Sequence, residues 1–268
     1  MSDIAFSGSV PAGYHTHLRS LLFEPYAREL ASRLPARRPL DVLETACGTG
    51  ILTLRLAETL DGEGTLHATD INDDMLVVAR DHLGSRAGAV SLATADMVDL
   101  PSADGAFDVV VCQFGLMFAP EPGLALREAR RVLRDGGLLL LSTWAELADN
   151  PAPHAAHTVV LDEFPDDPPR FYETPFGMAD PERLASLLAD SGFGEIEVEI
   201  VAKTGYAPSA SEAALGLVSG NPIADAIRAR DPSRLEPVRE RIAERLTTLF
   251  GDGELHIPLR AIVASGAC

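Results

Sequence analysis

The stretch VLETACGTG, residues 42–50, decides the fold of this chain. The apolar residues Leu40, Val42 and Leu43 lead to the acid Glu44, a turn of small residues follows, and a helical pattern begins near residue 49. This order is typical of a strand, a turn that lets a ligand approach the backbone, and a helix N-terminus with free N–H groups. The stretch therefore predicts a site for a nucleotide-like ligand.

Strand and helix patterns alternate along the chain after this stretch. Strands are expected at about 40–44, 65–69, 89–94, 107–112, 138–142, 196–201 and 256–264. Helices are expected at about 49–60, after Asn72, at 122–134 and at 181–190, with Asp135-Gly136-Gly137 ending the third. The alternation predicts an α/β, Rossmann-like, doubly wound and mostly parallel seven-stranded sheet with late insertions.

The whole chain, residues 1–268, is expected to form a single domain. An N-terminal helical cap (1–39) precedes a cofactor-binding core (40–144), and two cap or insertion segments (145–180 and 207–250) follow. Both segments are too long to be plain connectors, and we expect them to cover a ligand site. A helix over 234–249 carries one apolar stripe, expected to pack on the sheet or between subunits, so that a homodimer is a possible assembly. Its members are Leu235, Val238, Ile242, Leu246 and Leu249.

Charge and composition exclude several classes of protein. The net charge of −18 would repel a nucleic-acid backbone and an anionic membrane surface. The three cysteines form no CxxC pair and no cluster with metal-ligand spacing, so no metal is expected. The N-terminus lacks the pattern of a signal peptide, and no apolar run reaches the ~20 residues of a membrane span. These features predict a cytoplasmic protein with reduced thiols.

Polar residues stand where the expected strands end, at the edge where an open α/β sheet binds ligands. Asp70 follows Gly50 by 20 residues, a position from which an acid accepts both ribose hydroxyls. Asp96 could accept from an adenine amino group while the N–H of Met97 donates to a ring nitrogen, and the carbonyl of Gln113 could receive an ammonium. Taken alone, such an acid is more often a helix cap, so the ordered set carries the prediction.

The chain resembles the class I S-adenosylmethionine-dependent methyltransferases, in particular the quinone-biosynthesis and small-molecule group. The resemblance is carried by LETACGTG (43–50), ATDINDDML (68–76), ADM (95–97), CQFGLMF (112–118) and ARRVLRDGG (129–137). It covers about residues 40–144 densely and implies S-adenosylmethionine as cofactor.

The resemblance also implies a role for each matching residue. Glu44, Thr45, Ala46, Gly48 and Gly50 belong to the pocket for the methionine and ribose parts of the cofactor. The remaining cofactor-binding residues are Asp70 at the ribose, Ile71 and Met75 beside the adenine, Asp96 and Met97 at its edge, and Gln113 by the methionine. Met75 alone would more often be a core residue.

Two residues in and after the glycine turn refine the prediction. Thr53 bears on the type of cofactor, and Ala46 bears on the backbone conformation of the turn. A dinucleotide fingerprint, G-x-G-x-x-G, would need glycine where Thr53 stands, which disfavours a nicotinamide cofactor. Ala46 replaces the first glycine common in the family motif, and alanine is expected there only with a negative φ.

The expected activity is transfer of a methyl group from S-adenosylmethionine to a small-molecule acceptor, at an O, N or C atom. Two alternatives stay open: a protein that uses this cofactor in a reaction other than methylation, and a non-catalytic binding or regulatory protein. Candidates for the acceptor pocket are Tyr14, His17, Phe118 and His154. His15, His17, His154 and His157 could each act as a base, but each is more often a locally satisfied histidine, and no catalytic residue is assigned.

Overall fold

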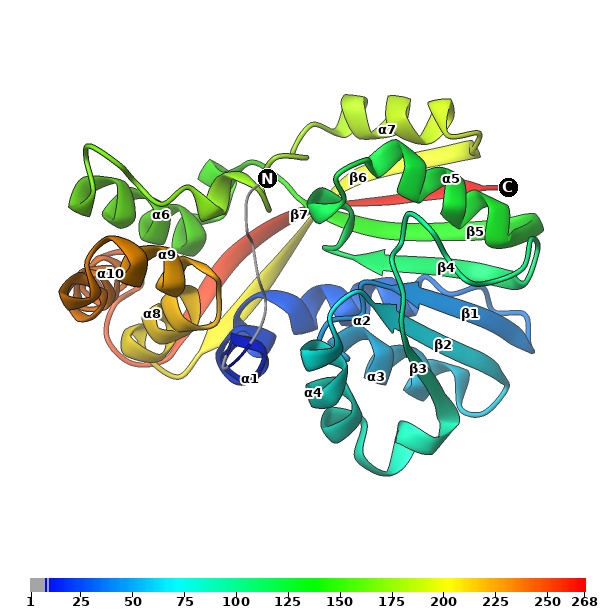
Figure 1. The fold of residues 1–268 in the computed structure, drawn as a ribbon, viewed down its shortest axis with the longest axis horizontal. Helices are drawn as coiled ribbons and strands as arrows, with labels where there is room; N and C mark the ends of the chain where they lie inside the picture. The colour runs from blue at the N-terminus through cyan, green and yellow to red at the C-terminus, as the bar shows by residue number, and fades with distance from the viewer. Residues whose placement is uncertain (1–7, 9) are drawn as a thin grey trace.

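Seven strands form one sheet in the computed structural model, which describes residue 8 and residues 10–268 (Figure 1). The strand order is β3-β2-β1-β4-β5-β7-β6, and β7 alone runs antiparallel to its neighbours. The strands are β1 (Leu40–Thr45), β2 (Gly64–Asp70), β3 (Val90–Thr94), β4 (Phe107–Gln113), β5 (Leu133–Trp144), β6 (Gly194–Ala207) and β7 (Leu255–Ala267). The predicted doubly wound, mostly parallel seven-stranded sheet is confirmed.

Residues 1–7 and 9 lie outside the described residues. They include the start of the expected N-terminal cap and the segment in which no signal peptide was predicted.

The order of the strands reverses between β1 and β4, which pair in parallel from Val42↔Val109 to Glu44↔Val111. The chain moves outward from β1 through β2 to β3 and then crosses back to β4 on the other side. Loops leaving the carboxyl ends of two such strands diverge, and this opens a crevice for a ligand. The fold therefore places the turn after β1 opposite the exit of β4.

Alternate residues of the central strands pack toward opposite faces, because side chains of a strand point to the two faces in turn. Val109 and Val111 belong to the cluster that includes the inner sides of α2 (Glu24–Ser32), α3 (Ile51–Leu60) and α4 (Asp73–Leu83). Val110 and Cys112 belong to a second cluster beneath α5 (Pro122–Val132) and α7 (Pro181–Asp190). The sheet is thus a middle layer between two layers of helices.

Further helices gather at one end of the molecule, beyond the carboxyl ends of the parallel strands (Figure 1). They are α6 (Pro151–Glu163), α8 (Ala210–Ser219), α9 (Ile223–Arg230) and α10 (Leu235–Phe250). The N-terminal segment, α1 (Val10–Gly13) with the π-helix η1 (Tyr14–Phe23), lies between this end and the sheet. Short 3-10 turns are η2 (Gly84–Ala89), η3 (Leu116–Phe118), η4 (Leu147–Asp149), η5 (Phe171–Glu173) and η6 (Pro232–Arg234).

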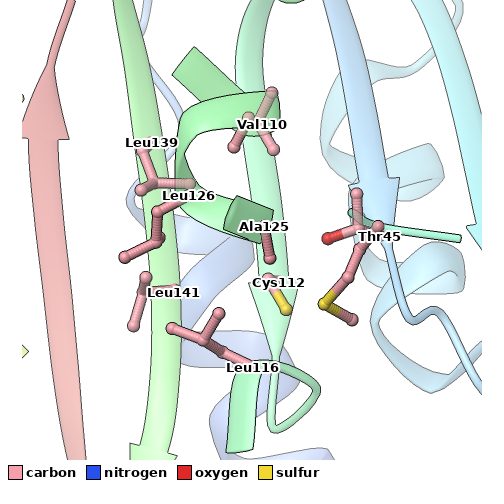
Figure 2. A pocket seen from close by; sticks show the side chains of 10 residues that line it. Thr45, Val110, Cys112, Leu116, Ala125, Leu126, Leu139 and Leu141 are labelled. Carbon is pink, nitrogen blue, oxygen red and sulfur yellow. The ribbon is translucent and has the colours of Figure 1, made fainter. Parts of the chain in front are cut away.

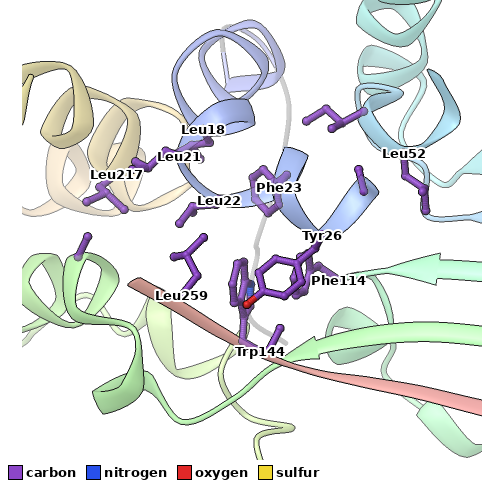
Figure 3. Packing of buried hydrophobic residues seen from close by; sticks show 14 of the residues in the cluster. Leu18, Leu21, Leu22, Phe23, Tyr26, Leu52, Phe114, Trp144, Leu217 and Leu259 are labelled. Carbon is purple, nitrogen blue, oxygen red and sulfur yellow. The ribbon is translucent and has the colours of Figure 1, made fainter. Parts of the chain in front are cut away.

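One apolar cluster joins the N-terminal segment, the sheet and the helical end. Figure 3 shows Phe23 and Tyr26 facing Phe114 and Trp144, while Leu18 and Leu21 reach toward Leu217. The rings of Phe114 and Trp144 stack with centroids 4.0 Å apart. Burial of such large aromatic and aliphatic surfaces stabilises the contact between the three parts.

Asn150 attaches the helical end to the sheet through hydrogen bonds. This residue is fully buried, its amide nitrogen donates to the carbonyl of Arg260, and its amide oxygen accepts from the N–H of Arg260. Because Arg260 lies on β7, the start of α6 is fixed to that strand.

The apolar stripe of α10 packs within the chain, mainly against other helices and to a smaller extent on the sheet at β7. Val238, Ile242 and Leu246 are fully buried, and α10 packs mainly against α8 and α6. Only Leu249 is substantially exposed. The stripe is satisfied by neighbouring helices that the sequence pattern did not pair with it.

The expected end of the helix before β5 is wrong by two residues. The helix ends at Val132, and Leu133 already pairs with Phe107 of β4. The Asp135-Gly136-Gly137 turn lies inside the β5 segment, where Gly136 has a φ of 72° and the pairing shifts before Leu138 resumes it. The glycines thus allow a turn within a strand, a use that resembles a helix stop in sequence.

Candidate functional site

Asp70, at the end of β2, holds the small-residue turn that follows β1. Its carboxylate accepts the backbone N–H of Gly48 at 2.8 Å and that of Asn72 at 2.9 Å. The N–H of Cys47 donates to the carbonyl of Thr69 at 2.9 Å, so the turn is tied to β2 at two points. The sequence placed Asp70 beside this turn, and the structure brings the two together.

The turn has the left-handed backbone that only short or absent side chains tolerate well. The φ angles are 51° at Ala46, 54° at Gly48 and 78° at Gly50. A Cβ atom at Gly50 would also lie 3.2 Å from the Cα of Ala79 on α4, so glycine is needed for close packing there. The expectation of a negative φ at Ala46 is therefore wrong, and this residue keeps a strained conformation that glycine would adopt freely.

Glu44, the last residue but one of β1, has a buried carboxyl group with one oxygen that lacks a hydrogen-bond partner. Its side chain is 1% exposed, and Oε2 has no hydrogen-bond partner. Burial raises the pKa of Glu44 to about 8; the nearby Thr53 hydroxyl opposes the shift, and the charge of Asp70 adds to it. Burial also raises the pKa of Asp70, against the backbone N–H groups that stabilise its charged form.

The residues expected around an adenine occupy different environments. Ile71 is 67% exposed, which is unusual for a large apolar side chain. Met75 is buried at 5% exposure, whereas Asp96 is exposed and accepts the N–H of Val98 at 3.1 Å. Met97 is half-buried beside them. Their roles toward a ligand remain predictions.

A small cavity lies between the sheet and α5, close to Thr45 and Met97. It has a volume of about 20 Å³ and an apolar lining that includes Cys112, Leu116 and Leu126 (Figure 2). That volume has room for about one water molecule and for no larger ligand. Thr45 therefore belongs to the packed layer below the turn.

The exit of β4 contributes Gly115, a residue that sequence reasoning missed, directly after Phe114. Phe114 has a φ of 52°, and a Cβ atom at Gly115 would lie 2.4 Å from the Cβ of Ala46. Gln113 donates from its side-chain nitrogen to the carbonyl of Phe23 at 3.2 Å, and its Oε1 is buried without a hydrogen-bond partner. The sequence signal for Gly115 was its position, because it is a glycine two residues after the end of β4, on the side of the sheet where the turn lies.

The N-terminal segment covers the turn through its histidine and tyrosine. His15 shares a hydrogen bond of 3.1 Å between Nδ1 and the hydroxyl of Thr49, and its ring contacts that of His82 at 4.3 Å. Burial lowers the pKa of His15 to about 4, and His82 and Arg19 add to this. Tyr14 stacks on Phe23 at 4.5 Å, and burial, with the charge of Asp70, raises the pKa of its phenol.

The other candidates for the acceptor pocket lie farther apart. His17 pairs through Nδ1 with Glu212 of α8 at 3.1 Å, and His154 is exposed on α6. Phe118 is half-buried against the main core at the exit of β4. His157 was considered only as a base; its Nδ1 is buried without a hydrogen-bond partner, and its ring lies 6.1 Å from Tyr172. These positions leave the membership of an acceptor pocket a prediction.

The described part of the chain has neither a candidate metal site nor a helix that could span a membrane. Residue 8 and residues 10–268 contain no group of three His, Cys, Asp or Glu side chains placed to hold a metal ion. Over the same residues, no helix is both long and apolar enough to cross a membrane.

Comparison with known proteins identifies the core of the chain. Residues 42–137 match the family described as methyltransferase domain. The chain is similar to the ubiquinone/menaquinone biosynthesis C-methyltransferase UbiE of Idiomarina loihiensis, with 42% identity over 107 residues. The aligned part is 39% of this chain and 43% of that protein, so the chain spans less than half of this relative's length.

Two solved structures share the fold. Phosphoethanolamine N-methyltransferase 2 of Haemonchus contortus, in complex with phosphomonomethylethanolamine and S-adenosylhomocysteine, has a TM-score of 0.60 and 15% identity, covering 96% of this chain and 56% of that one. The cyclase SpnF has a TM-score of 0.54 and 19% identity, covering 91% and 81%. Residues 42–137 thus match a methyltransferase domain, and they lie within a fold that these solved structures share.

Proposed function

We propose that this chain binds S-adenosylmethionine where β1, β2 and β4 end, and transfers its methyl group to a small-molecule acceptor. The observation that carries the proposal is the glycine turn after β1, held by Asp70 at the point where the strand order reverses. This point lies within the stretch that matches the methyltransferase domain.

The residues present fit this cofactor in charge and polarity. Glu44 and Gln113 each keep a buried oxygen without a partner, and a ligand ammonium is a group that would satisfy such acceptors. Asp70 would accept the ribose hydroxyls with its remaining lone pairs, and the exposed side chain of Ile71 would offer an apolar surface to the adenine. Asp96 and Met97 would read the adenine edge.

The chain contributes position and shelter to the reaction. When bound, the cofactor supplies an electrophilic methyl carbon on a sulfonium, and a transfer in line with that bond gains chiefly from alignment of the acceptor. Tyr14, Phe23, Phe114 and Trp144 form an apolar aromatic layer beside Gln113, suited to exclude water from an organic acceptor. We assign no catalytic base.

Donor binding and methyl transfer are tested separately. The chain is incubated with donor carrying a labelled methyl group and with a panel of quinols, phenols and amines, and we expect label in one of these small molecules. Quinols come first in the panel because the similar relative is named for ubiquinone and menaquinone biosynthesis. Calorimetry with Asp70→Ala should show donor affinity reduced at least about tenfold, because two ribose hydrogen bonds are lost.

The exposed Asp81 on α4 provides the matched control, and Asp81→Ala should bind the donor as the unchanged chain does. Unchanged affinity in Asp70→Ala would refute the ribose assignment. Tight donor binding without transfer to any acceptor would favour the alternatives, a reaction other than methylation or a non-catalytic binding role.

The setting of the protein is part of the same proposal. The net charge of −18 supports a small-molecule acceptor over a nucleic acid. A cytoplasmic location and a homodimer stay proposals, which fractionation of the source cells and light scattering of the purified chain would test.

A further inference from the structure

Residues 10–17 contact two separate parts of the chain at once. His15 shares a hydrogen bond of 3.1 Å between its Nδ1 and the hydroxyl of Thr49, in the turn after β1. Two residues later, Nδ1 of His17 pairs with the carboxylate of Glu212 on α8, also at 3.1 Å. One short segment thus connects the proposed donor site to the helical end of the molecule.

The proposed donor site is closed beneath this segment. Glu44 and Asp70, which we propose to hold the donor, are 1% and 8% exposed, and Thr49 in the turn between them is 1% exposed. His15 contacts Thr49 directly. Burial and the charge of Asp70 raise the pKa of the Tyr14 phenol, so this phenol lies within electrostatic reach of the carboxylate. A donor therefore reaches the turn only when the segment moves.

The two halves of the N-terminal segment are attached in different ways. Every apolar side chain from Leu18 to Phe23 is buried, and these side chains belong to the main apolar cluster. In residues 10–17, by contrast, only Val10 and Pro11 are buried, and the other side chains are half-buried or exposed. Segments with few buried apolar contacts open at a lower free energy than the core does. Residues 10–17 are therefore the half that is free to move, and the half from Leu18 onward is the anchor.

The backbone at the boundary between the two halves has an unusual winding. Over all ten residues of η1, from Tyr14 to Phe23, the chain forms a π-helix. π-helices are rare, and they occur frequently at functional sites. Their hydrogen bonds span one residue more than those of an α-helix, so a shift of one residue per bond converts one form into the other. Such a shift would turn residues 14–17 relative to the anchored Leu18.

We propose that residues 10–17 form a lid that opens to admit the donor and closes over it, held shut by His15 on the donor turn and by His17 on α8. The inference rests on the proposed function. Because both contacts belong to one short segment, opening the lid breaks both. The contact with Glu212 therefore controls how fast the donor is exchanged, although this residue lies on a different element from the donor site.

A lid of this kind has a kinetic signature of its own. The lid is closed in the free chain and in the donor-bound chain, so weakening the closed state speeds donor entry and donor exit alike. The two rate constants rise together, and their ratio, the dissociation constant, stays nearly the same. A side chain that contacts the donor would instead change the affinity, mainly through the dissociation rate.

The experiment measures both rate constants on the full chain without any acceptor. Stopped-flow fluorescence follows donor association, because Trp144 is the single tryptophan, stacks on Phe114 and lies 6.3 Å from Phe23 in the anchored half. Dissociation is measured independently of fluorescence, by chasing methyl-labelled donor from the chain with excess unlabelled donor. The same association measurement with S-adenosylhomocysteine shows whether the lid acts on both ligands.

His15→Ala and His17→Ala each remove one of the two contacts. We expect each variant to raise both rate constants by about three- to tenfold, the factor by which one hydrogen bond commonly shifts an equilibrium. The dissociation constant should stay within about twofold of that of the unchanged chain. Glu212→Ala removes the same contact as His17→Ala from the side of α8 and should have the same effect.

Thr16→Ala is the matched control. Thr16 is exposed and lies between the two histidines, and the change to alanine favours the helix as the other two do without removing either contact. Its rate constants should equal those of the unchanged chain. Thermal unfolding should give similar midpoints for all variants, so that faster exchange is not partial unfolding.

The possible outcomes separate the lid from the proposed function. Unchanged rates in both histidine variants would overturn the lid while the proposed function stands. Faster exchange in His15→Ala alone, with no effect of His17→Ala and Glu212→Ala, would overturn the joint control by α8. Weaker affinity without faster association would make His15 a donor contact and not a part of a lid. If the unchanged chain binds neither donor nor S-adenosylhomocysteine, the proposed function itself fails.

Discussion

Strand β1 carries an acid near each end, and the two acids differ in their partners and in the direction of their pKa shifts. Asp41, at the amino end, accepts the hydroxyl of Thr65 at 2.7 Å and a guanidinium N–H of Arg134 at 2.7 Å, and these contacts lower its pKa. Glu44, three residues later, is buried without a cation, and burial raises its pKa to about 8. We call the side of the sheet at the amino end of β1 the compensated edge, because cationic partners balance the charge of its acids. The side at the carboxyl end of β1, where Glu44 has no cation, is the uncompensated edge.

The compensated edge extends to β4. Asp108 accepts the backbone N–H of Asp41 at 2.8 Å, Arg134 at 2.7 Å and Arg37 at 3.1 Å, and together these outweigh the effect of burial and lower its pKa. Acids at this edge connect β1, β4 and β5 within the chain. At the opposite edge, Glu44 and Gln113 each keep a buried oxygen without a partner, and this is the edge where we propose that the ligand binds.

The largest expected effect is on the pH dependence of stability in the free chain. Because the pKa of Glu44 is raised from 4.5 to about 8, its stabilising contribution is complete below pH 4.5 and is lost as the pH rises toward 8. Between pH 6.5 and pH 8 this amounts to about 2 kcal/mol of unfolding free energy, at ~1.4 kcal/mol per pH unit. Urea unfolding across this range measures the loss.

Two variants separate the edges in this experiment. Glu44→Gln should flatten the loss between pH 6.5 and pH 8, whereas Asp108→Asn should leave it unchanged. Asp108 acts on the acid side instead, since its lowered pKa gives a contribution present above its ordinary value of 3.8 and lost as the pH falls further. An equal alkaline loss in Glu44→Gln would contradict the assignment of a buried, uncompensated acid.

A smaller effect is expected when the compensated edge loses its shared cation. Arg134→Met removes the partner of both Asp41 and Asp108, and should lower the unfolding free energy by about 1–2 kcal/mol, since the guanidinium is partly solvent-screened. Donor affinity should not change, because Arg134 lies at the edge away from the turn. Arg37→Met, which touches Asp108 alone, is the control and should cost less. A loss of donor affinity in Arg134→Met would break the separation of the two edges.

The smallest effect concerns strain at the uncompensated edge. Ala46→Gly should raise the unfolding free energy by about 0.5–1 kcal/mol, because glycine adopts a φ of 51° without steric conflict. The same change should rescue Gly115→Ala, whose new methyl group would collide with Ala46. Chemical denaturation of the two single variants and the double variant measures the coupling. Additive effects would show that the two residues do not meet.

The core of the fold was predictable because its signals are local. Alternating apolar strands and helical patterns gave the seven-stranded sheet, and the spacing from Gly50 to Asp70 put an acid beside the glycine turn, where the structure has it. The positive φ of Ala46 could not be inferred, because it depends on how the turn packs against Gly115. The end of α5 was misplaced because the turn glycines belong to a shifted strand pairing.

Contacts between distant segments escaped prediction for the same reason. The pairing of His15 with Thr49 and of His17 with Glu212 joins residues 34 and 195 positions apart, and no periodicity encodes either. The apolar stripe of α10 correctly predicted that one face of this helix is buried, but it did not predict that α8 and α6 cover that face. Roles of individual side chains toward ligands remain predictions at this site.

Residues 208–254 form one excursion from the sheet. Ala207 of β6 pairs directly with Leu255 of β7, so the chain leaves and re-enters the fold at neighbouring positions. The segment between them, with α8, α9 and α10, is therefore a single module that could be replaced without changing the order or pairing of the strands. Exchange of this module for that of another protein with the same strand pairing would change the helical end beyond the proposed donor site while leaving every strand of the sheet in place.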